Sequence, residues 1–380
     1  MQSGPENTRA DEPEVSLLVN LRGAEQWWAA RYEFLKEQGY MLRPRYRPGW
    51  KASFTEVLDT FDCEDGQSLQ YAQIMDAIRI SDSTMVAIKR VDNPLVEGKR
   101  TISTEERMMT LFSSDEHASN PQNHSIPLLQ ALHIPEIEAE SLLVMPWMRS
   151  PVSPHFRSVG EGLQFIKEIF EGVQYLHQNH VAHRDCSLNN MVMDARTMYP
   201  DGFHPSKPSR SYDWKTRAKH FSRTRCPPRY YLIDYGFSRI YDPSKPRPLT
   251  YGIRSGGIEP PETKKPCDPF ATDVYLLGMT VRLDILDGRG DWENPGIRGF
   301  EFLRPLVNDM TQDDPSQRPN MDEVLSRFSE VVHSLSSFQL RSRVPKKDDN
   351  PLLTPFRAVS HLIWTCDMLL KRRPAIPVSQ

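Results

Sequence analysis

The sequence lacks several features that would assign it to a special class of protein. No run of about 18 apolar residues occurs, as a membrane-spanning helix requires, and the first residues lack the apolar core of a signal peptide. The five cysteines are widely spaced and form no CxxC pair, so neither a zinc site nor a disulfide framework is indicated. The net charge of -3 gives no global attraction to nucleic acid or anionic lipid. We therefore expect an intracellular protein, cytoplasmic or nuclear, with no membrane partner and with nucleic acid disfavoured.

The composition is ordinary for a globular protein, with 26% charged and 38% apolar residues. Residues 1 to about 15 are polar and predict a disordered arm. The stretch EQWWAARYEFLKEQ at 25–38 predicts an amphipathic helix. Its aromatic residues are expected in the core: Trp27, Trp28 and Phe34.

Between about residues 50 and 150 short apolar runs predict strands, with one helical stretch at 103–112. The run SLLVMPWM at 141–148 predicts a buried strand that ends at a proline. Beyond it, apolar residues recur on one helix face: Leu163, Ile166, Ile169 or Phe170, Val173 and Leu176. The sequence therefore predicts a sheet-rich part followed by a helical part.

Residues 194–229 are basic, aromatic and proline-containing without a clear period, which predicts an insertion loop. Its Lys and Arg residues, interleaved with Tyr, Trp and Phe, could stack on nucleic acid. A solvated loop packed by its own aromatic side chains is the better interpretation. The C-terminal segment predicts a tail with one short helix around 356–371.

Six short motifs follow one another along the chain, and their order matters more than any one of them. They are VAIK at 86–89, HRDCSLNN at 183–190, YYLIDYG at 230–236, PPE at 260–262, DVYLLG at 273–278 and DPSQRP at 314–319. Asp185 and Asn190, five residues apart on a loop, can direct one side chain at a substrate hydroxyl and the other at a metal ion. Asp234 ends an apolar strand and could lie beside that metal.

This motif set resembles that of the eukaryotic protein kinases, over roughly residues 70–335. The resemblance implies an α+β, bilobal protein-kinase-like fold, with a small sheet-rich N-lobe at 51–148 and a larger helical C-lobe at 149–340. An N-terminal arm and helix at 1–50 would precede the lobes, and a tail at 341–380 would follow them. The resemblance also implies ATP and Mg²⁺ as cofactors and a protein substrate.

The resemblance implies a role for each motif residue. Asp185 would accept the proton of the attacking hydroxyl, and Asn190 and Asp234 would hold Mg²⁺. Lys89 would hold the α- and β-phosphates of ATP and pair with a glutamate, for which the spacing of apolar residues favours Glu105.

Glu106 is the alternative partner of that lysine. Ser103 and Glu106 also fit a local capping box, which gives Glu106 a structural explanation of about equal weight.

The stretch LLVMPWM resembles the hinge between the lobes of a kinase, with Met145 at the gatekeeper position. Proline is tolerable at 146 because only its carbonyl group is required. The residues that the resemblance implies around the adenine are Ala87, Met145, Pro146, Met148 and Val192.

Other matches imply structural roles. Glu262 and Arg318 resemble a buried ion pair that ties the activation segment to the lower lobe. Asp273 resembles the helix-start carboxylate that braces the catalytic loop, and Arg184 resembles the arginine that couples this loop to the activation segment.

Three departures from the kinase pattern bear on activity. No GxGxxG precedes VAIK, and Gly66 is the one glycine between Trp50 and Ile80. Ser187 stands where serine/threonine kinases usually carry a lysine that supports the transferred phosphoryl group. Tyr235 in place of phenylalanine is a mild change, because the ring fills the same space.

RYRPGW at 45–50, HRDC, the long basic insertion and NHSIPLL at 123–129 together resemble a divergent kinase-like family of mushroom-forming fungi. The leading hypothesis is an ATP-dependent protein kinase acting on serine or threonine. A pseudokinase that serves as a binding or regulatory scaffold is the alternative, favoured by Ser187 and the missing glycines. A small-molecule kinase fits less well, because those relatives lack the last three motifs. The sequence does not indicate the oligomeric state.

Overall fold

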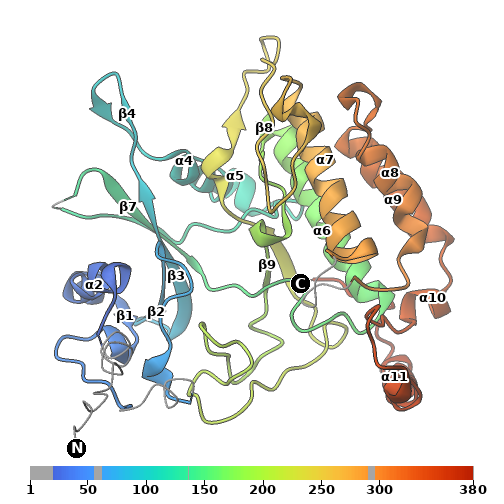
Figure 1. Cartoon of the computed structure of the whole chain (residues 1–380), viewed down its shortest axis with the longest axis horizontal. Coiled ribbons are helices and arrows are strands. Elements are labelled where there is room, and N and C mark those ends of the chain that lie inside the picture. The colour runs from blue at the N-terminus through green and yellow to red at the C-terminus, as the bar shows by residue number, and fades with distance from the viewer. Residues whose placement is uncertain (1–19, 55–61, 136, 290–295, 380) are drawn as a thin grey trace, which may run out of the picture. The chain divides into compact units, whose positions relative to one another are not determined.

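The computed structural model describes residues 20–54, 62–135, 137–289 and 296–379 (Figure 1). The arm expected at 1–15 lies outside these residues. The chain forms two compact units, each described by itself. Unit 1 comprises residues 1–93, 129–147 and 199–219, and unit 2 comprises residues 94–128, 148–198 and 220–380.

Unit 1 is built on a five-stranded antiparallel sheet with the order β1-β2-β3-β7-β6. The strands are β1 (Tyr40–Leu42), β2 (Ile74–Arg79), β3 (Thr84–Asp92), β6 (Gln130–His133) and β7 (Glu140–Pro146). The strand predicted at 141–148 is confirmed and ends at Pro146, which has no N–H to continue the ladder. The VAIK segment lies in β3, between β2 and β7.

The single helix expected at 25–38 is wrong, because two short helices form instead, α2 (Gly23–Ala29) and α3 (Tyr32–Glu37). The N–H of Arg31 bonds to the carbonyl of Trp28, which tightens the chain between the helices. The break allows side chains from both helices to enter the sheet core, where the following residues are buried: Trp28, Tyr32 and Leu35. Trp27 and Phe34 are partly buried against the same core, so the aromatic residues act as predicted.

Unit 2 is mainly helical. Its helices are α4 (Thr104–Phe112), α5 (Asp115–Ala118), α6 (Val159–Gln178), α7 (Pro269–Val281), α8 (Arg304–Met310), α9 (Met321–Ser334), α10 (Ser337–Arg341) and α11 (Thr354–Leu370). Three two-stranded ladders accompany them: β4 (Leu95–Val96) with β5 (Lys99–Arg100), β8 (Val181–Ala182) with β11 (Arg239–Ile240), and β9 (Met191–Asp194) with β10 (Arg229–Leu232). The helix predicted at 103–112 is α4, and Ser103 caps it by accepting a hydrogen bond from the N–H of Glu106.

Helix α6 is the predicted helix with the apolar period, but it is buried on more than one face. Fifteen of its 20 residues are buried, so it lies inside unit 2 rather than on its surface. Gly172 shows why a small residue is needed there, because a Cβ at this position would come within 2.8 Å of the Cβ of His124. The helix therefore provides the support on which the neighbouring loops are built.

The insertion predicted at 194–229 connects β9 to β10. Its residues 199–219 belong to unit 1, although the chain on both sides belongs to unit 2. Tyr199 and Phe203 are buried and pack edge to face, with ring centroids 5.1 Å apart. The loop is thus packed by its own aromatic residues as expected, and its other residues include many that are exposed.

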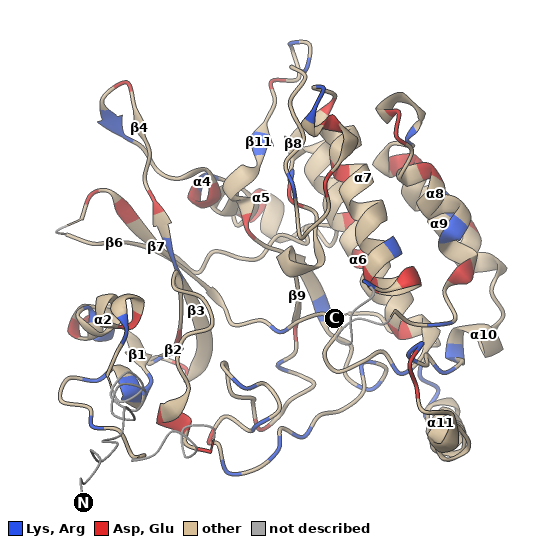
Figure 2. Ribbon diagram, viewed as in Figure 1, with Lys and Arg blue, Asp and Glu red and all other residues tan. Residues whose placement is uncertain are grey.

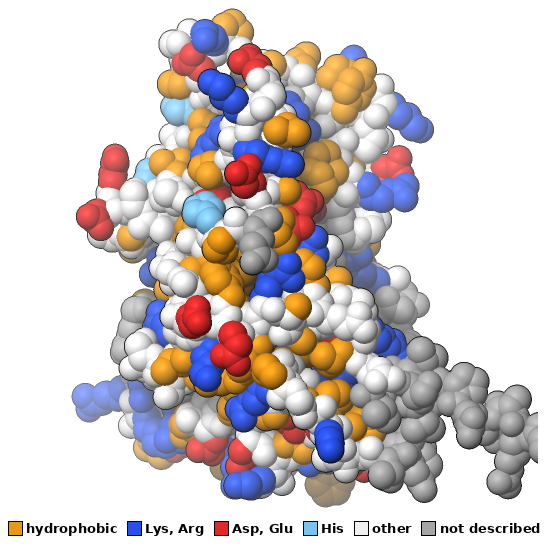
Figure 3. Space-filling view, turned by 90° about the vertical axis from the view of Figure 1, so that its left-hand side faces the viewer, with side chains coloured by type: hydrophobic (Ala, Val, Ile, Leu, Met, Phe, Trp, Pro, Cys, Tyr) orange, Lys and Arg blue, Asp and Glu red, His pale blue; other side chains and the backbone are white. Residues whose placement is uncertain are grey.

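The surface is mixed in charge on the face that Figure 3 shows, where basic and acidic side chains are interspersed. All five cysteines carry free thiols. Within the described ranges, no helix has both the length and the hydropathy needed to cross a lipid bilayer.

Candidate active site

The HRDCSLNN motif forms the loop that follows β8 in unit 2. It ends in a 3-10 turn at Leu188–Asn190 and leads directly into β9. The side-chain amide of Asn190 donates a hydrogen bond of 2.9 Å to the carbonyl oxygen of Asp185. The loop thus holds Asp185 and Asn190 together, as the motif spacing predicts.

A buried carboxylate braces this loop. Asp273 accepts hydrogen bonds from the backbone N–H of His183 at 2.8 Å and from that of Arg184 at 2.6 Å. His177 of α6 lies 3.0 Å from the same carboxylate. Asp273 is the fifth residue of α7 and not its first, so the expected helix-start position is wrong; Asp268 caps that helix instead. The bracing role nevertheless holds, because two backbone groups of the loop need an acceptor away from water.

His183 connects the catalytic loop to the strand that carries the third motif. Its Nδ1 accepts a hydrogen bond from the N–H of Asp185, and its Nε2 donates to the carbonyl of Ile233. Burial lowers the pKa of His183, although Asp273, Asp185 and Asp234 oppose this shift. The ring is therefore neutral at physiological pH and sits among three carboxylates.

Asp234 follows β10 and has a left-handed backbone, with φ of 65°. Left-handed conformations are uncommon outside glycine and cluster at functional sites. The next residue, Tyr235, is fully buried between the rings of His183 and Phe112, with centroids 5.1 and 6.3 Å away. Tyrosine therefore fills the position expected for phenylalanine, and its burial anchors the turn that carries Asp234.

Arg184 links the catalytic loop to the segment that follows Asp234. Its guanidinium donates hydrogen bonds to the carbonyl oxygens of Phe237 at 3.3 Å and Tyr251 at 3.2 Å. Further along this segment, Glu262 and Arg318 form the predicted ion pair, with both side chains almost completely buried. The expectation of a buried Glu262–Arg318 pair is confirmed.

Ser187, which stands at the position of the kinase lysine, is also buried. Gly256 lies against it, so a Cβ at Gly256 would come within 2.6 Å of the Cβ of Ser187. Gly256 has a positive φ of 52°, which glycine adopts without strain. Gly256 thus packs closely against Ser187, and a larger residue at 256 would overlap with it.

The other predicted ATP-binding residues divide between the units. In unit 1, Lys89 and Ala87 project from the same face of β3, and Ala87 pairs with Met145 of β7. Pro146 ends β7. The remaining ones lie in unit 2: Glu105 on α4, Met148, and Val192 on β9. The pairing of Lys89 with Glu105 or Glu106 joins residues of different units and stays a prediction.

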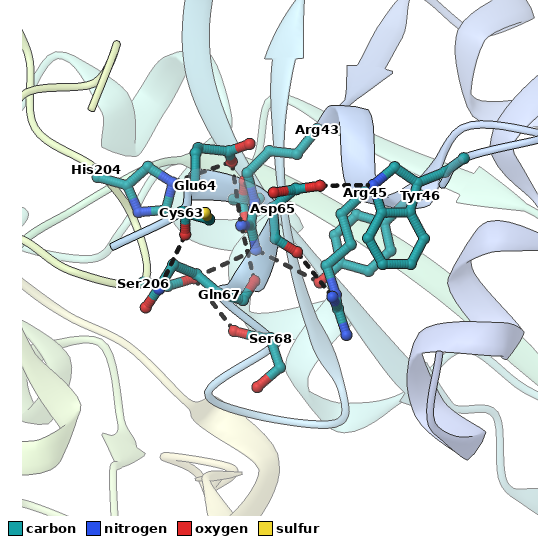
Figure 4. Close-up of polar contacts among 12 residues, drawn as sticks. Arg43, Arg45, Tyr46, Cys63, Glu64, Asp65, Gln67, Ser68, His204 and Ser206 are labelled. Atoms are coloured by element: carbon teal, nitrogen blue, oxygen red, sulfur yellow. Dashed lines mark hydrogen bonds and ion pairs between the residues drawn. The ribbon is translucent and has the colours of Figure 1, made fainter. Parts of the chain in front are cut away.

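The glycine-rich hairpin of kinases is replaced in unit 1 by a long connection between β1 and β2. Figure 4 shows Arg43 among polar groups of this connection. Its guanidinium bonds to Asp76 at 2.9 Å, to the carbonyl of Gln67 at 3.0 Å and to Ser206 of the insertion at 3.2 Å. Burial alone would lower the pKa of Arg43, but Asp76 and nearby acidic groups more than offset it and raise the pKa. Arg43 therefore remains charged and ties the connection to the insertion.

Two further contacts hold the insertion to this connection. His204, fully buried, lies 3.2 Å from the carboxylate of Glu64, and Trp214 donates a hydrogen bond to the carbonyl of Asp62. Burial would raise the pKa of Glu64, but His204 and Arg43 lower it. Sequence reasoning missed this cluster, because its members are far apart in the chain and follow no period. The basic run before Trp50 was the one available signal.

The donor set near Asp185 fits a magnesium ion. Mg²⁺ prefers oxygen ligands from one or two side chains together with phosphate oxygens. Because the amide nitrogen of Asn190 donates to Asp185, its amide oxygen is left for a cation, and Asp234 would supply a carboxylate.

A pocket of about 1100 Å³ lies elsewhere in unit 2. It is lined by residues of α6 and α7, by Glu262 and Arg318, and by the segment 313–322. None of Asp185, Asn190 and Asp234 lines it, so it is separate from the candidate catalytic residues.

No model of a known protein family matches the chain. Several curated proteins are similar to it, all of them kinases. Serine/threonine-protein kinase PLK4 of Drosophila persimilis is 25% identical over 281 residues, covering 67% of this chain and 31% of that protein. Two kinases of Dictyostelium discoideum also match. Dual specificity protein kinase zakA is 24% identical, and the match covers 43% of this chain and 22% of zakA. Probable serine/threonine-protein kinase ireA is 23% identical, and the match covers 46% of this chain and 16% of ireA.

The chain spans less than a third of the length of these relatives. The sheet-rich unit and the helical unit agree with the α+β, bilobal kinase-like fold. Together with the distant similarity to serine/threonine kinases, this supports placing the chain in the protein-kinase superfamily.

Proposed function

We propose that the chain is an ATP-dependent protein kinase that transfers the γ-phosphate to a serine or threonine hydroxyl of a protein. The observation that carries the proposal is the catalytic loop of unit 2. Asp185 and Asn190 are bonded to each other there, Asp273 braces the loop, and His183 connects it to the strand before Asp234. A protein that only binds partners would not require a base (Asp185), an amide ligand (Asn190) and a carboxylate (Asp234) in and beside one hydrogen-bonded loop.

In this mechanism Asp185 orients the attacking hydroxyl and accepts its proton as the new oxygen–phosphorus bond forms. ADP leaves with the electrons of the broken bond. Asn190 and Asp234 hold Mg²⁺, which supplies positive charge at the phosphate oxygens when bound. Lys89 binds the α- and β-phosphates and pairs with Glu105. Ala87, Met145, Pro146, Met148 and Val192 surround the adenine.

The finer assignments belong to the same proposal. Preference for serine or threonine is supported by the names of the similar proteins, and membership of the fungal kinase-like family by the motifs quoted above. A pseudokinase is the second candidate. It is favoured by the β1–β2 connection, which has no glycine-rich hairpin, and by the close contact of Ser187 with Gly256.

The test measures binding and transfer separately. Calorimetry with ATP at millimolar concentration, with and without Mg²⁺, measures binding, and radiolabelled ATP reports autophosphorylation and phosphorylation of a generic basic protein. We expect weak binding that depends on Mg²⁺ and slow transfer. Asp185→Asn should reduce transfer by about 10²–10⁴-fold and leave nucleotide affinity within about twofold. Absence of Mg²⁺-dependent ATP binding by the wild-type chain would favour the pseudokinase.

A further inference from the structure

Helix α11 exposes an apolar face that nothing in the described chain covers. The apolar side chains on this face are each more than half exposed: Phe356, Val359, Leu362, Ile363, Leu369 and Leu370. Leu352, in the 3-10 turn Pro351–Leu353 that leads into the helix, is exposed to the same degree. Cys366 is exposed among them. The opposite face holds the helix to unit 2 through Trp364 and Met368, which are buried. Figure 2 shows α11 as a largely uncharged helix at the edge of unit 2. A contiguous exposed apolar face of this kind marks an interaction site.

The spacing of the exposed residues indicates what they bind. Six of them follow one another at alternating steps of four and three: Leu352, Phe356, Val359, Ile363, Cys366 and Leu370. This is the heptad spacing of a coiled-coil seam, which keeps one stripe of a helix facing a partner helix. Leu362 and Leu369 widen the stripe on one side. The face is therefore built for another helix with the same repeat.

We propose that a second copy of this chain covers the face, through an antiparallel, two-fold symmetric pair of α11 helices. In the antiparallel register centred between Val359 and Ile363, each residue of the seam falls opposite another member of the seam. Phe356 lies opposite Cys366 of the second copy, Val359 opposite Ile363, and Leu352 opposite Leu370. A two-fold interface must be self-complementary in this way, and the seam meets that requirement along its whole length.

The cations at the C-terminal end of α11 favour the antiparallel direction. Lys371, Arg372 and Arg373 follow the helix and are exposed, whereas the residues before it, Lys346 to Asp349, carry as many cations as anions, and Asp349 pairs with Arg343 and Arg357. An antiparallel pair keeps the three cations of one copy away from those of the other, and opposes the two helix dipoles favourably. A parallel pair would bring six cations together at one end.

The extent of the seam predicts a weak dimer. Seven apolar side chains that each bury roughly 60–120 Å² give on the order of 400–800 Å² per copy. Standard stable interfaces bury about 800 Å² per partner, and smaller ones are transient. We therefore expect a monomer–dimer equilibrium with a dissociation constant in the micromolar range.

The first experiment measures the mass of the full chain by sedimentation equilibrium between about 1 and 500 μM. We expect the average mass to rise toward that of a dimer. Ile363→Glu, which places a charge in the centre of the seam, should weaken the dimer at least tenfold. Ala358→Glu is the matched control, because it adds the same charge to an exposed position of the same helix outside the seam, and it should dimerise like the wild type. A monomer at every concentration, or equal effects of the two variants, overturns the proposal.

The second experiment tests the direction of the helices by disulfide formation under mild oxidation. In the antiparallel pair the two Cys366 residues lie about 15 Å apart along the axis, too far for a disulfide. Wild-type chains should therefore not cross-link through Cys366, whereas Phe356→Cys should form a covalent dimer that Cys366→Ser abolishes. A direct Cys366–Cys366 disulfide would mean a parallel pair. If the chain stays monomeric and sediments with phosphatidylserine vesicles, and Ile363→Glu prevents this, a membrane surface and not a second copy covers the face. Either result overturns the proposal.

Discussion

The catalytic loop of unit 2 and the β1–β2 connection of unit 1 depart from the kinase pattern to different degrees. The loop keeps Asp185 and Asn190, and its backbone is bonded to Asp273 as the motifs imply. The connection has no GxGxxG sequence, and its described residues are organised around a buried arginine, Arg43. The residues proposed to act in phosphoryl transfer are thus held as the motifs imply, whereas the segment between β1 and β2 lacks the glycines that the kinase pattern places there. This difference predicts an enzyme that is weak in binding rather than one that has lost its chemistry.

The insertion explains how the rebuilt connection is held. Glycine-rich loops bring main-chain N–H groups close to phosphates because glycine has no side chain. In this protein the insertion supplies His204, Ser206 and Trp214, which hold the connection by side-chain contacts.

The largest expected effect on stability tests the buried ion pair of unit 2. Arg318→Ala should reduce the free energy of unfolding by about 3–5 kcal/mol, because it leaves Glu262 buried without its partner. Arg327→Ala is the control, since Arg327 pairs with Asp309 at the surface and surface pairs contribute at most about 1 kcal/mol. Urea unfolding measures both. Similar midpoints for Arg318→Ala and Arg327→Ala would contradict the buried pair.

The corresponding change in unit 1 tests the rebuilt connection. Arg43→Ala leaves Asp76 unpaired in the core and should also cost about 3–5 kcal/mol. Arg79→Ala, at the end of β2, removes an exposed pair with Asp82 of the turn that follows and should cost less than about 1 kcal/mol. Hydrogen exchange locates the loss, which we expect in β1, β2 and residues 199–219. Unchanged exchange of the insertion in Arg43→Ala would show that Arg43 does not hold it.

Much of the catalytic loop was predictable from sequence, and the connection was not. Asp185, Asn190 and Asp273 lie in short motifs whose order is informative, and the Glu262–Arg318 pair could be expected although the two residues are far apart in the chain. Arg43, Glu64 and His204 belong to no motif, and their contact depends on where a long loop returns.

Helix boundaries show the same limit of sequence reasoning. Amphipathic periodicity over 25–38 predicted one helix. The chain forms two short helices instead, which lets both Trp28 and Tyr32 pack in the core of the sheet. The helix expected around 356–371 begins at Thr354 and ends at Leu370, close to the prediction. Its exposure could not be predicted, because periodicity identifies an apolar face and not what covers it.

A smaller effect concerns how the free energy of unfolding depends on pH through His124, which packs against helix α6. Burial lowers the pKa of His124 from 6.5 to about 4, and its Nδ1 lies 2.8 Å from the carbonyl of Tyr230. Because the unfolded chain takes up the proton more readily, stability should fall as the pH drops from about 6.5 to 4, by up to about 3 kcal/mol from this residue. His124→Asn keeps a donor but removes the titration. Comparing the unfolding of wild type and variant at pH 7 and pH 4.5 isolates the contribution, and an identical pH dependence would refute it.

The smallest expected effect on transfer tests whether the segment packed against the catalytic loop matters for turnover. Gly256→Ala adds a Cβ that meets Ser187 and forces alanine into a positive φ, whereas Gly257→Ala imposes a positive φ with its nearest contact at 3.6 Å. Backbone strain should cost each variant about 1–3 kcal/mol, and the overlap with Ser187 should cost Gly256→Ala about 1–2 kcal/mol more. Since Ser187 lies two residues after Asp185, the overlap should shift the base and slow transfer about tenfold relative to Gly257→Ala. Urea unfolding and the radiolabelled transfer assay measure the two effects. Equal turnover of the two variants would mean that the position of Ser187 does not control the base, and that the contacts of Asp273, His183 and Asn190 suffice to hold the catalytic loop.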